Sequence, residues 1–160
     1  VFHLIRNAHM SVDELDTLFN KRSGMMGLTG FGDLREVHRL VEEGNEDAKL
    51  ALDIYVHRIV GFIGNYTAQM GGVDVITFTA GVGENDDVVR KMVCDKLAPF
   101  GVKLDEEKNA TRSKDPRIIS TPDSAVPICV IPTNEELAIA RKSAAIAEEG
   151  KDSYGNVFSK

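Results

Sequence analysis

Apolar side chains follow two different patterns in the middle of the chain. Over residues 46–70 they recur every three or four positions in a broad band, which predicts a long helix buried on most of its circumference. Gly61 and Gly64 lie inside this pattern and indicate close packing against another backbone. Residues 73–80 are instead almost uniformly apolar and rich in β-branched side chains, which predicts a strand covered on both faces.

Shorter patterns and end signals predict the remaining elements. Ser11 with Glu14 three positions later is a capping box for a helix over residues 11–20, and Asp33 precedes a second helical pattern that stops at Gly44. Thr133 and Glu136 form the same box before a last helix that runs to about Glu149. The other predicted elements are a glycine-rich loop over 23–32, a helix over 86–98, a polar stretch over 102–116 without clear periodicity, and short strands near 117–121 and 126–131.

Strands alternate with helices in this order, so the fold class is α/β with a largely parallel core sheet. A chain of 160 residues suits one domain, yet three strands are few for such a sheet. We therefore expect residues 1–150 to form a single partial domain of a larger protein. The polar residues 151–160 are expected to form a flexible tail.

Composition narrows the classes of function. A net charge of −6, without a local cluster of Lys and Arg, argues against nucleic acid and anionic membranes as partners. No apolar run approaches the roughly 18 to 20 residues that a membrane span needs. The two cysteines, Cys94 and Cys129, fit neither a disulfide framework nor a metal site, and they indicate a reducing, cytoplasmic location.

A loop with two glycines joins the strand over 73–80 to the helix that follows. Gly81 and Gly83 carry no Cβ, and the N–H groups at a helix start attract anions, so the loop suits a phosphate or a nucleotide. The segment is not a dinucleotide fingerprint, because Asp86 occupies the third glycine position. It is not a P-loop either, because no Lys-Ser/Thr pair follows the glycines. The alternative is a tight structural turn with Asn85 or Asp86 as the N-cap.

Three motifs together resemble one known family. The segment Thr77–Asn85 (TFTAGVGEN), with Asn20–Gly24 (NKRSG) before it and Pro132–Leu137 (PTNEEL) after it, is similar to the acetokinase family of short-chain carboxylate kinases. The resemblance covers nearly the whole chain but only the later part of such an enzyme. It implies part of an actin-like domain, with a small, mostly parallel sheet and several helices.

The resemblance also implies which residues bind ligands. The nucleotide, ATP or ADP, would contact Gly81, Val82, Gly83, Glu84 and Asn85, with Asp33, Leu34 and Arg35 lining the adenosine pocket. Phe31-Gly32 departs from the family, which usually has hydroxyl residues before this Asp. Glu135 would hold Mg²⁺. Taken without the family, Asp33 is a helix cap and Glu135 is a first-turn residue favoured by the helix dipole.

The activity that the resemblance implies for the parent protein is reversible, ATP-dependent phosphorylation of acetate to acetyl phosphate. The family's catalytic arginines and histidine would lie earlier in the enzyme, so this chain would contain no catalytic residue and be inactive alone. One alternative is a propionate or butyrate kinase of the same family. Others are a non-enzymatic nucleotide-binding module and an interaction domain, since the family forms homodimers through its second domain.

Overall fold

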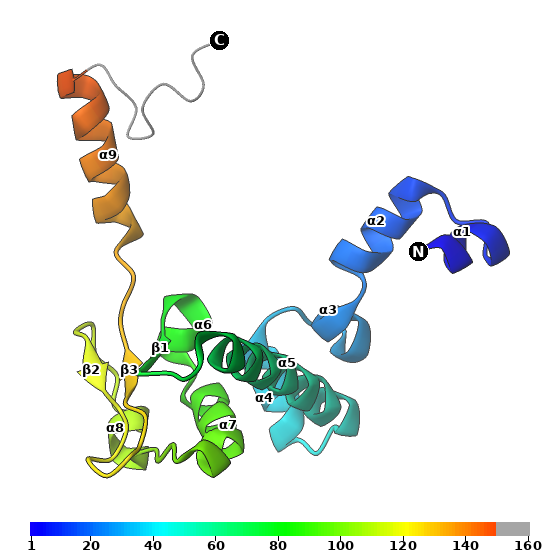
Figure 1. The fold of residues 1–160 in the computed structure, drawn as a ribbon. Coiled ribbons are helices and arrows are strands. Elements are labelled where there is room, and N and C mark those ends of the chain that lie inside the picture. Colours follow the sequence, from blue (N-terminus) through cyan, green and yellow to red (C-terminus); the bar gives the residue numbers. More distant parts are fainter. Residues whose placement is uncertain (150–160) are drawn as a thin grey trace. The chain divides into compact units, whose positions relative to one another are not determined.

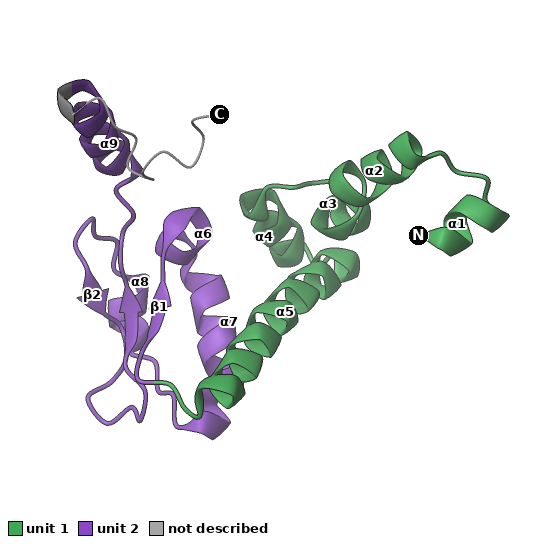
Figure 2. Ribbon diagram, turned by 45° about the horizontal axis from the view of Figure 1, so that its top comes forward, with its two compact units in different colours: residues 1–73 green, residues 74–160 purple. Residues whose placement is uncertain are grey.

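The computed structural model describes residues 1–149, and its chain divides into two compact units, Val1–Val73 and Asp74–Lys160 (Figure 2). Each unit is described by itself below. The division into two units does not test the expected single partial domain over residues 1–150, which stays a prediction. The tail expected over residues 151–160 lies outside the described residues.

The first unit is helical, and α3 and α4 both pack against α5 (Figure 1). Side-chain caps fix where three of its helices begin: Ser11 and Glu14 form the predicted capping box, and Asp33 and Asn45 each accept a bond from a backbone N–H in the first turn. The predicted helices over 11–20 and 46–70 are confirmed. The elements are α1 (Phe2–Asn7), α2 (Val12–Lys21), α3 (Gly24–Thr29), α4 (Leu34–Glu42) and α5 (Glu46–Met70).

The long helix α5 is buried over much less of its surface than its pattern predicts. Its buried residues, Ala48, Ala51, Leu52 and Val56, all belong to the first half. In the second half Phe62, Tyr66 and Met70 are 50%, 55% and 66% exposed. A Cβ at Gly61 or Gly64 would meet no heavy atom within 4 Å. Within the first unit, the expected close packing of these glycines is therefore not found, because helical spacing shows which face could be buried and not what covers it.

The second unit holds a small sheet in the order β1-β3-β2 (Figure 1). Strand β1 pairs in parallel with β3, with Thr77 opposite Cys129, while β2 pairs antiparallel with β3. The sheet is thus mixed and not mostly parallel. The elements are β1 (Ile76–Phe78), α6 (Ala80–Asn85), α7 (Asp87–Leu97), a 3₁₀ turn η1 (Ala98–Phe100), α8 (Glu106–Ala110), β2 (Arg117–Ile118), β3 (Ile128–Val130) and α9 (Glu135–Glu149).

Three short helices were missed by the sequence patterns. The predicted loop over 23–32 contains α3, the predicted glycine loop is the helix α6, and the polar stretch over 102–116 contains α8. Each has five or six residues, too few to display a helical period. The strand expected over 73–80 is correspondingly shorter, and Thr77 in its centre is exposed. Among the described helices, none combines the length and apolar character needed to cross a membrane.

A buried arginine joins three elements of the second unit. Arg90 on α7 is 2% exposed, and its guanidinium donates to the Asn109 side chain at 2.7 Å, to the Asn109 carbonyl at 2.7 Å and to the Gly83 and Glu84 carbonyls at 2.9 and 3.0 Å. The Asn109 amide in turn donates to the Asp87 carbonyl. Because a buried cation needs its donors satisfied, this network fixes α6 and α8 relative to α7.

Removing the Asn109 side chain tests this network. We expect Asn109→Ala to lower the free energy of unfolding by about 2 kcal/mol or more, since the buried guanidinium loses an acceptor. Asn65→Ala is the matched control: Asn65 also begins an Asn-X-Thr sequence, but it is exposed, and its side chain accepts a bond from Gln69 on the same helix. Urea denaturation of both variants should separate them, and equal losses would contradict the network's role.

Candidate functional site

The candidate site lies at the edge of the sheet where β1 and β3 end. Parallel strands point their carboxyl ends the same way, so the segments after Phe78 and after Val130 emerge side by side. A backbone bond from Ile131 N–H to the Phe78 carbonyl, at 2.9 Å, continues the pairing one residue past the end of β3. The sheet thereby brings the predicted glycine segment to the chain that leads into α9.

The glycine segment turns sharply from β1 into α6. Ala80 has a φ of +59°, a left-handed conformation that residues other than glycine, asparagine and aspartate seldom adopt, and the Thr79 side chain makes no cap bond. The two glycines play different parts. A Cβ at Gly83 would lie 3.1 Å from the Phe78 backbone, whereas one at Gly81 would meet no heavy atom within 4 Å. Gly83 therefore permits packing on the strand end, and Gly81 leaves open space.

Glu84 links the two segments at this edge. One of its carboxylate oxygens accepts bonds from the Thr133 N–H at 2.8 Å and from the Thr133 hydroxyl at 3.1 Å. The N–H of Thr133 is the main cause of a lowered pKa of Glu84, with smaller contributions from the Thr133 hydroxyl, the Ala80 N–H and the charge of Arg117. Burial opposes these contributions and does not outweigh them. The carboxylate is therefore ionised at neutral pH and holds the segments together.

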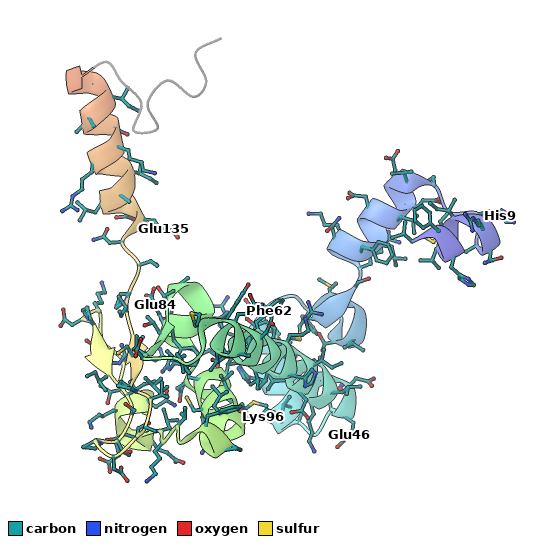
Figure 3. The ribbon with its side chains drawn as sticks, in the orientation of Figure 1. His9, Glu46, Phe62, Glu84, Lys96 and Glu135 are labelled. Carbon is teal, nitrogen blue, oxygen red and sulfur yellow. The ribbon has the colours of Figure 1, made fainter. Side chains whose placement is uncertain are left out.

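The start of α9 differs from its sequence prediction. Asn134 is the cap, since its side-chain oxygen accepts the Leu137 N–H at 3.0 Å. The predicted capping box of Thr133 with Glu136 is wrong, because Thr133 bonds to Glu84 on the neighbouring segment. Glu135 is consequently the first helical residue, and it is exposed at the base of α9 (Figure 3). In the described part of the chain no group of three or more His, Cys, Asp or Glu could hold a metal.

A pocket of about 450 Å³ opens beside Glu84, within the range of roughly 300 to 1,000 Å³ that small-molecule sites occupy. Asn85 lines it, and its amide also donates to the Gly81 carbonyl at 2.8 Å, bracing α6. Glu135 follows directly on Asn134 in the pocket wall. The lining residues come from three segments: Glu84 and Asn85; Arg112, Ser113, Lys114 and Pro116; and Pro132, Thr133 and Asn134.

The second predicted nucleotide segment, Asp33–Arg35, belongs to the first unit. Asp33 caps α4 by accepting the Arg35 N–H at 2.9 Å, and the Arg35 guanidinium binds both carboxylate oxygens. The Arg35 side chain is the main cause that lowers the pKa of Asp33 to about 2. Leu34 is half-buried. The cap expected from sequence is confirmed, and the adenosine role of these residues stays a prediction.

The second unit thus gathers Glu84 and Asn85 around one pocket, next to Gly81, Val82 and Gly83 in the same short helix. Sequence reasoning missed Arg90, which holds the carboxyl end of this helix, and the cations Arg112 and Lys114 in the pocket wall. A polar stretch with no periodicity gave no signal for the two cations. An arginine within an apolar helical stripe, as at position 90, is a signal that could have been used.

Comparison with known proteins gives consistent matches. Residues 1–141 match the acetokinase family. The chain is 52% identical to the acetate kinase of Corynebacterium efficiens over 148 residues, which are 92% of this chain and 37% of that enzyme. It is 52% identical to the acetate kinase of Desulfotalea psychrophila over 143 residues, 89% of this chain and 35% of that enzyme. The chain therefore spans little more than a third of these relatives.

Solved structures agree with the sequence matches. The structure is similar to Porphyromonas gingivalis acetate kinase with a TM-score of 0.82 and 38% identity, covering 91% of this chain and 37% of that one. It is also similar to a propionate kinase from Francisella tularensis, with a TM-score of 0.80 and 38% identity over 88% of this chain and 35% of that one. These matches confirm the expected fold class, part of an actin-like domain.

The bond between Glu84 and Thr133 makes stability depend on pH. Because the folded-state pKa of Glu84 is lowered, its contribution is complete above the unfolded value of about 4.3 and is lost as pH falls through the folded value. We expect Glu84→Gln, which keeps an acceptor oxygen, to flatten the thermal stability profile between about pH 5 and pH 3. Glu36→Gln on α4 is the control, and an unchanged slope in Glu84→Gln would contradict the role of this carboxylate.

Proposed function

This chain belongs to the acetokinase family, and on that premise we propose that it forms the nucleotide-binding part of an acetate kinase. The reaction is reversible transfer of the γ-phosphoryl group of ATP to acetate, giving acetyl phosphate and ADP. The observation that carries the proposal is the open pocket at the carboxyl edge of the sheet, lined by Glu84 and Asn85 next to an unobstructed Gly81. Phosphoryl transfer depends mostly on positioning and electrostatics, so such a binding part is a large share of the machinery.

The residues of α6 are proposed to contribute to nucleotide binding in different ways. Gly81 and Val82 offer backbone N–H groups at the start of the helix, where Gly81 leaves room for a ligand to approach. Gly83 lets the helix sit against the end of β1, and Asn85 contributes its side chain to the pocket wall. Glu84 is proposed to contribute to the nucleotide site by lining the pocket and by positioning the helix through its bond to Thr133. Asp33, Leu34 and Arg35 are proposed to flank the adenosine.

We propose that Glu135 contacts Mg²⁺ bound to the nucleotide. A single exposed carboxylate fits this ion, which usually keeps several waters and binds through one or two carboxylates together with substrate phosphates. When bound, the ion would neutralise charge on the phosphates.

Acetate is the acceptor acid that we propose, because the relatives with about 50% identity are acetate kinases. The propionate kinase is similar at 38% identity, and the acid-binding residues are expected in the two thirds of the relatives that this chain does not match. We also propose a homodimer, supported by the exposed apolar residues in the second half of α5, and a cytoplasmic location, supported by the free thiols of Cys94 and Cys129.

Calorimetric titration with Mg·ADP tests the glycine segment. We expect Gly81→Val to weaken ADP binding by about tenfold or more, because a branched side chain would fill the space through which the ligand approaches the backbone. Gly81→Ala, whose Cβ stands in open space, is the control for the loss of glycine itself. Both variants should keep the unfolding temperature, and equal affinity for ADP in all three proteins would remove the proposed site.

The metal role of Glu135 is tested by the difference between ADP affinities with and without Mg²⁺. Glu135→Gln should shrink this difference while leaving the affinity for metal-free ADP unchanged, since an amide coordinates the ion more weakly than a carboxylate. Glu136→Gln, the neighbouring first-turn carboxylate, controls for the loss of a charge near the helix start. The same change in both variants would point to the dipole and not to the metal.

A further inference from the structure

The segment between α8 and β2 forms one wall of the pocket and has no part in the function proposed so far. We propose that Arg112 and Lys114 in this segment form a phosphate-binding subsite, which contacts a phosphoryl group of the ligand held in the pocket. The inference rests on the proposed function and deepens it, because it names the residues that recognise the anionic part of the ligand. The chemistry is common to the phosphates of ADP and to an acyl phosphate.

The charge of the pocket wall supports an anion. Arg112 and Lys114 are its cations, and within the described residues neither makes an ion pair. Other lysines of the same unit are paired: Lys91 with Glu106 at 2.7 Å and Lys103 with Asp123 at 2.6 Å. Glu84 is the carboxylate in the wall, and one of its two oxygens already accepts both bonds from Thr133. In a chain of net charge −6, this pocket keeps an excess of positive charge.

A third cation, Arg117, contacts the segment that forms this wall. Arg117 on β2 donates through one terminal nitrogen to the Ser113 carbonyl at 3.2 Å. Its Nε is buried and has no hydrogen-bond partner in the described part of the chain. The positive charge of Arg117 also reaches Arg90, where it opposes protonation, and Glu84, where it favours ionisation. The guanidinium therefore adds to an uncompensated positive field at the pocket, which an anionic ligand would neutralise.

The segment is held in place at several points. Its backbone is tied by the bond from Arg117 to Ser113 and by the Asp115 N–H, which donates to the Ser113 hydroxyl at 3.0 Å. At its start the Thr111 hydroxyl donates to the Glu107 carbonyl at 2.9 Å. Anchors on both sides of Arg112 and Lys114 reduce the ordering that binding would require of the backbone, while the two side chains stay exposed to receive a ligand.

The test is calorimetric titration of the 160-residue chain with ADP, adenosine and acetyl phosphate. We expect Arg112→Gln and Lys114→Gln each to weaken ADP binding by about tenfold at low salt, as the loss of one charged hydrogen bond to phosphate would do. Adenosine binding should not change. Lys96→Gln is the matched control, because Lys96 is an exposed cation on α7 that does not line the pocket (Figure 3).

The outcomes separate the two proposals. Weaker binding of ADP assigns the subsite to the nucleotide, and weaker binding of acetyl phosphate alone assigns it to the acyl phosphate. If Gly81→Val abolishes ADP binding while both cation variants bind every ligand like the wild type, the subsite is wrong and the proposed function stands. If the wild-type chain binds neither ADP nor acetyl phosphate, both are contradicted. An equal loss in Lys96→Gln would also overturn the subsite, since it would show a general charge effect.

Discussion

A single carboxylate holds together the two segments on which the candidate site depends. Glu84 in α6 bonds to Thr133, which lies 49 positions later in the sequence. The two residues follow β1 and β3, which are neighbours in the sheet. The same residue is anchored from behind, because its carbonyl accepts a bond from the buried Arg90. The short helix is therefore fixed at its side chain and at its backbone, which explains how six residues with two glycines keep one conformation.

Chemically similar residues around the pocket differ in how closely the surrounding protein contacts them. Of the two glycines, Gly83 lies against the end of β1, whereas Gly81 borders open space. Of the arginines, Arg90 is buried and donates its hydrogen bonds to backbone and amide oxygens of the protein. Arg112 lines the pocket and makes no ion pair in the described residues. Burial decides between these roles: a cation enclosed by protein must be satisfied internally, and one at a rim can bind from solvent.

The sequence predicted those elements whose signals are local. The bounds of α5 and the caps at Ser11, Asp33 and Asp86 follow from spacing and from side-chain chemistry within one turn, and all are found. The helix α6 was missed because it is too short for a period. The Thr133 box failed because a distant carboxylate competes for the same donors. The cations of the pocket could not be predicted, since their position depends on how three separate segments meet.

Strand β1 is an edge strand of the sheet, paired on one side with β3. In the described residues its other side offers unpaired backbone groups, on a segment of Ile76, Thr77 and Phe78 that carries neither a charge nor a proline. An exposed edge strand of this kind is a template onto which another strand can add. We therefore expect concentrated solutions of the chain to associate through this edge, and self-association alone would not be evidence of the proposed dimer.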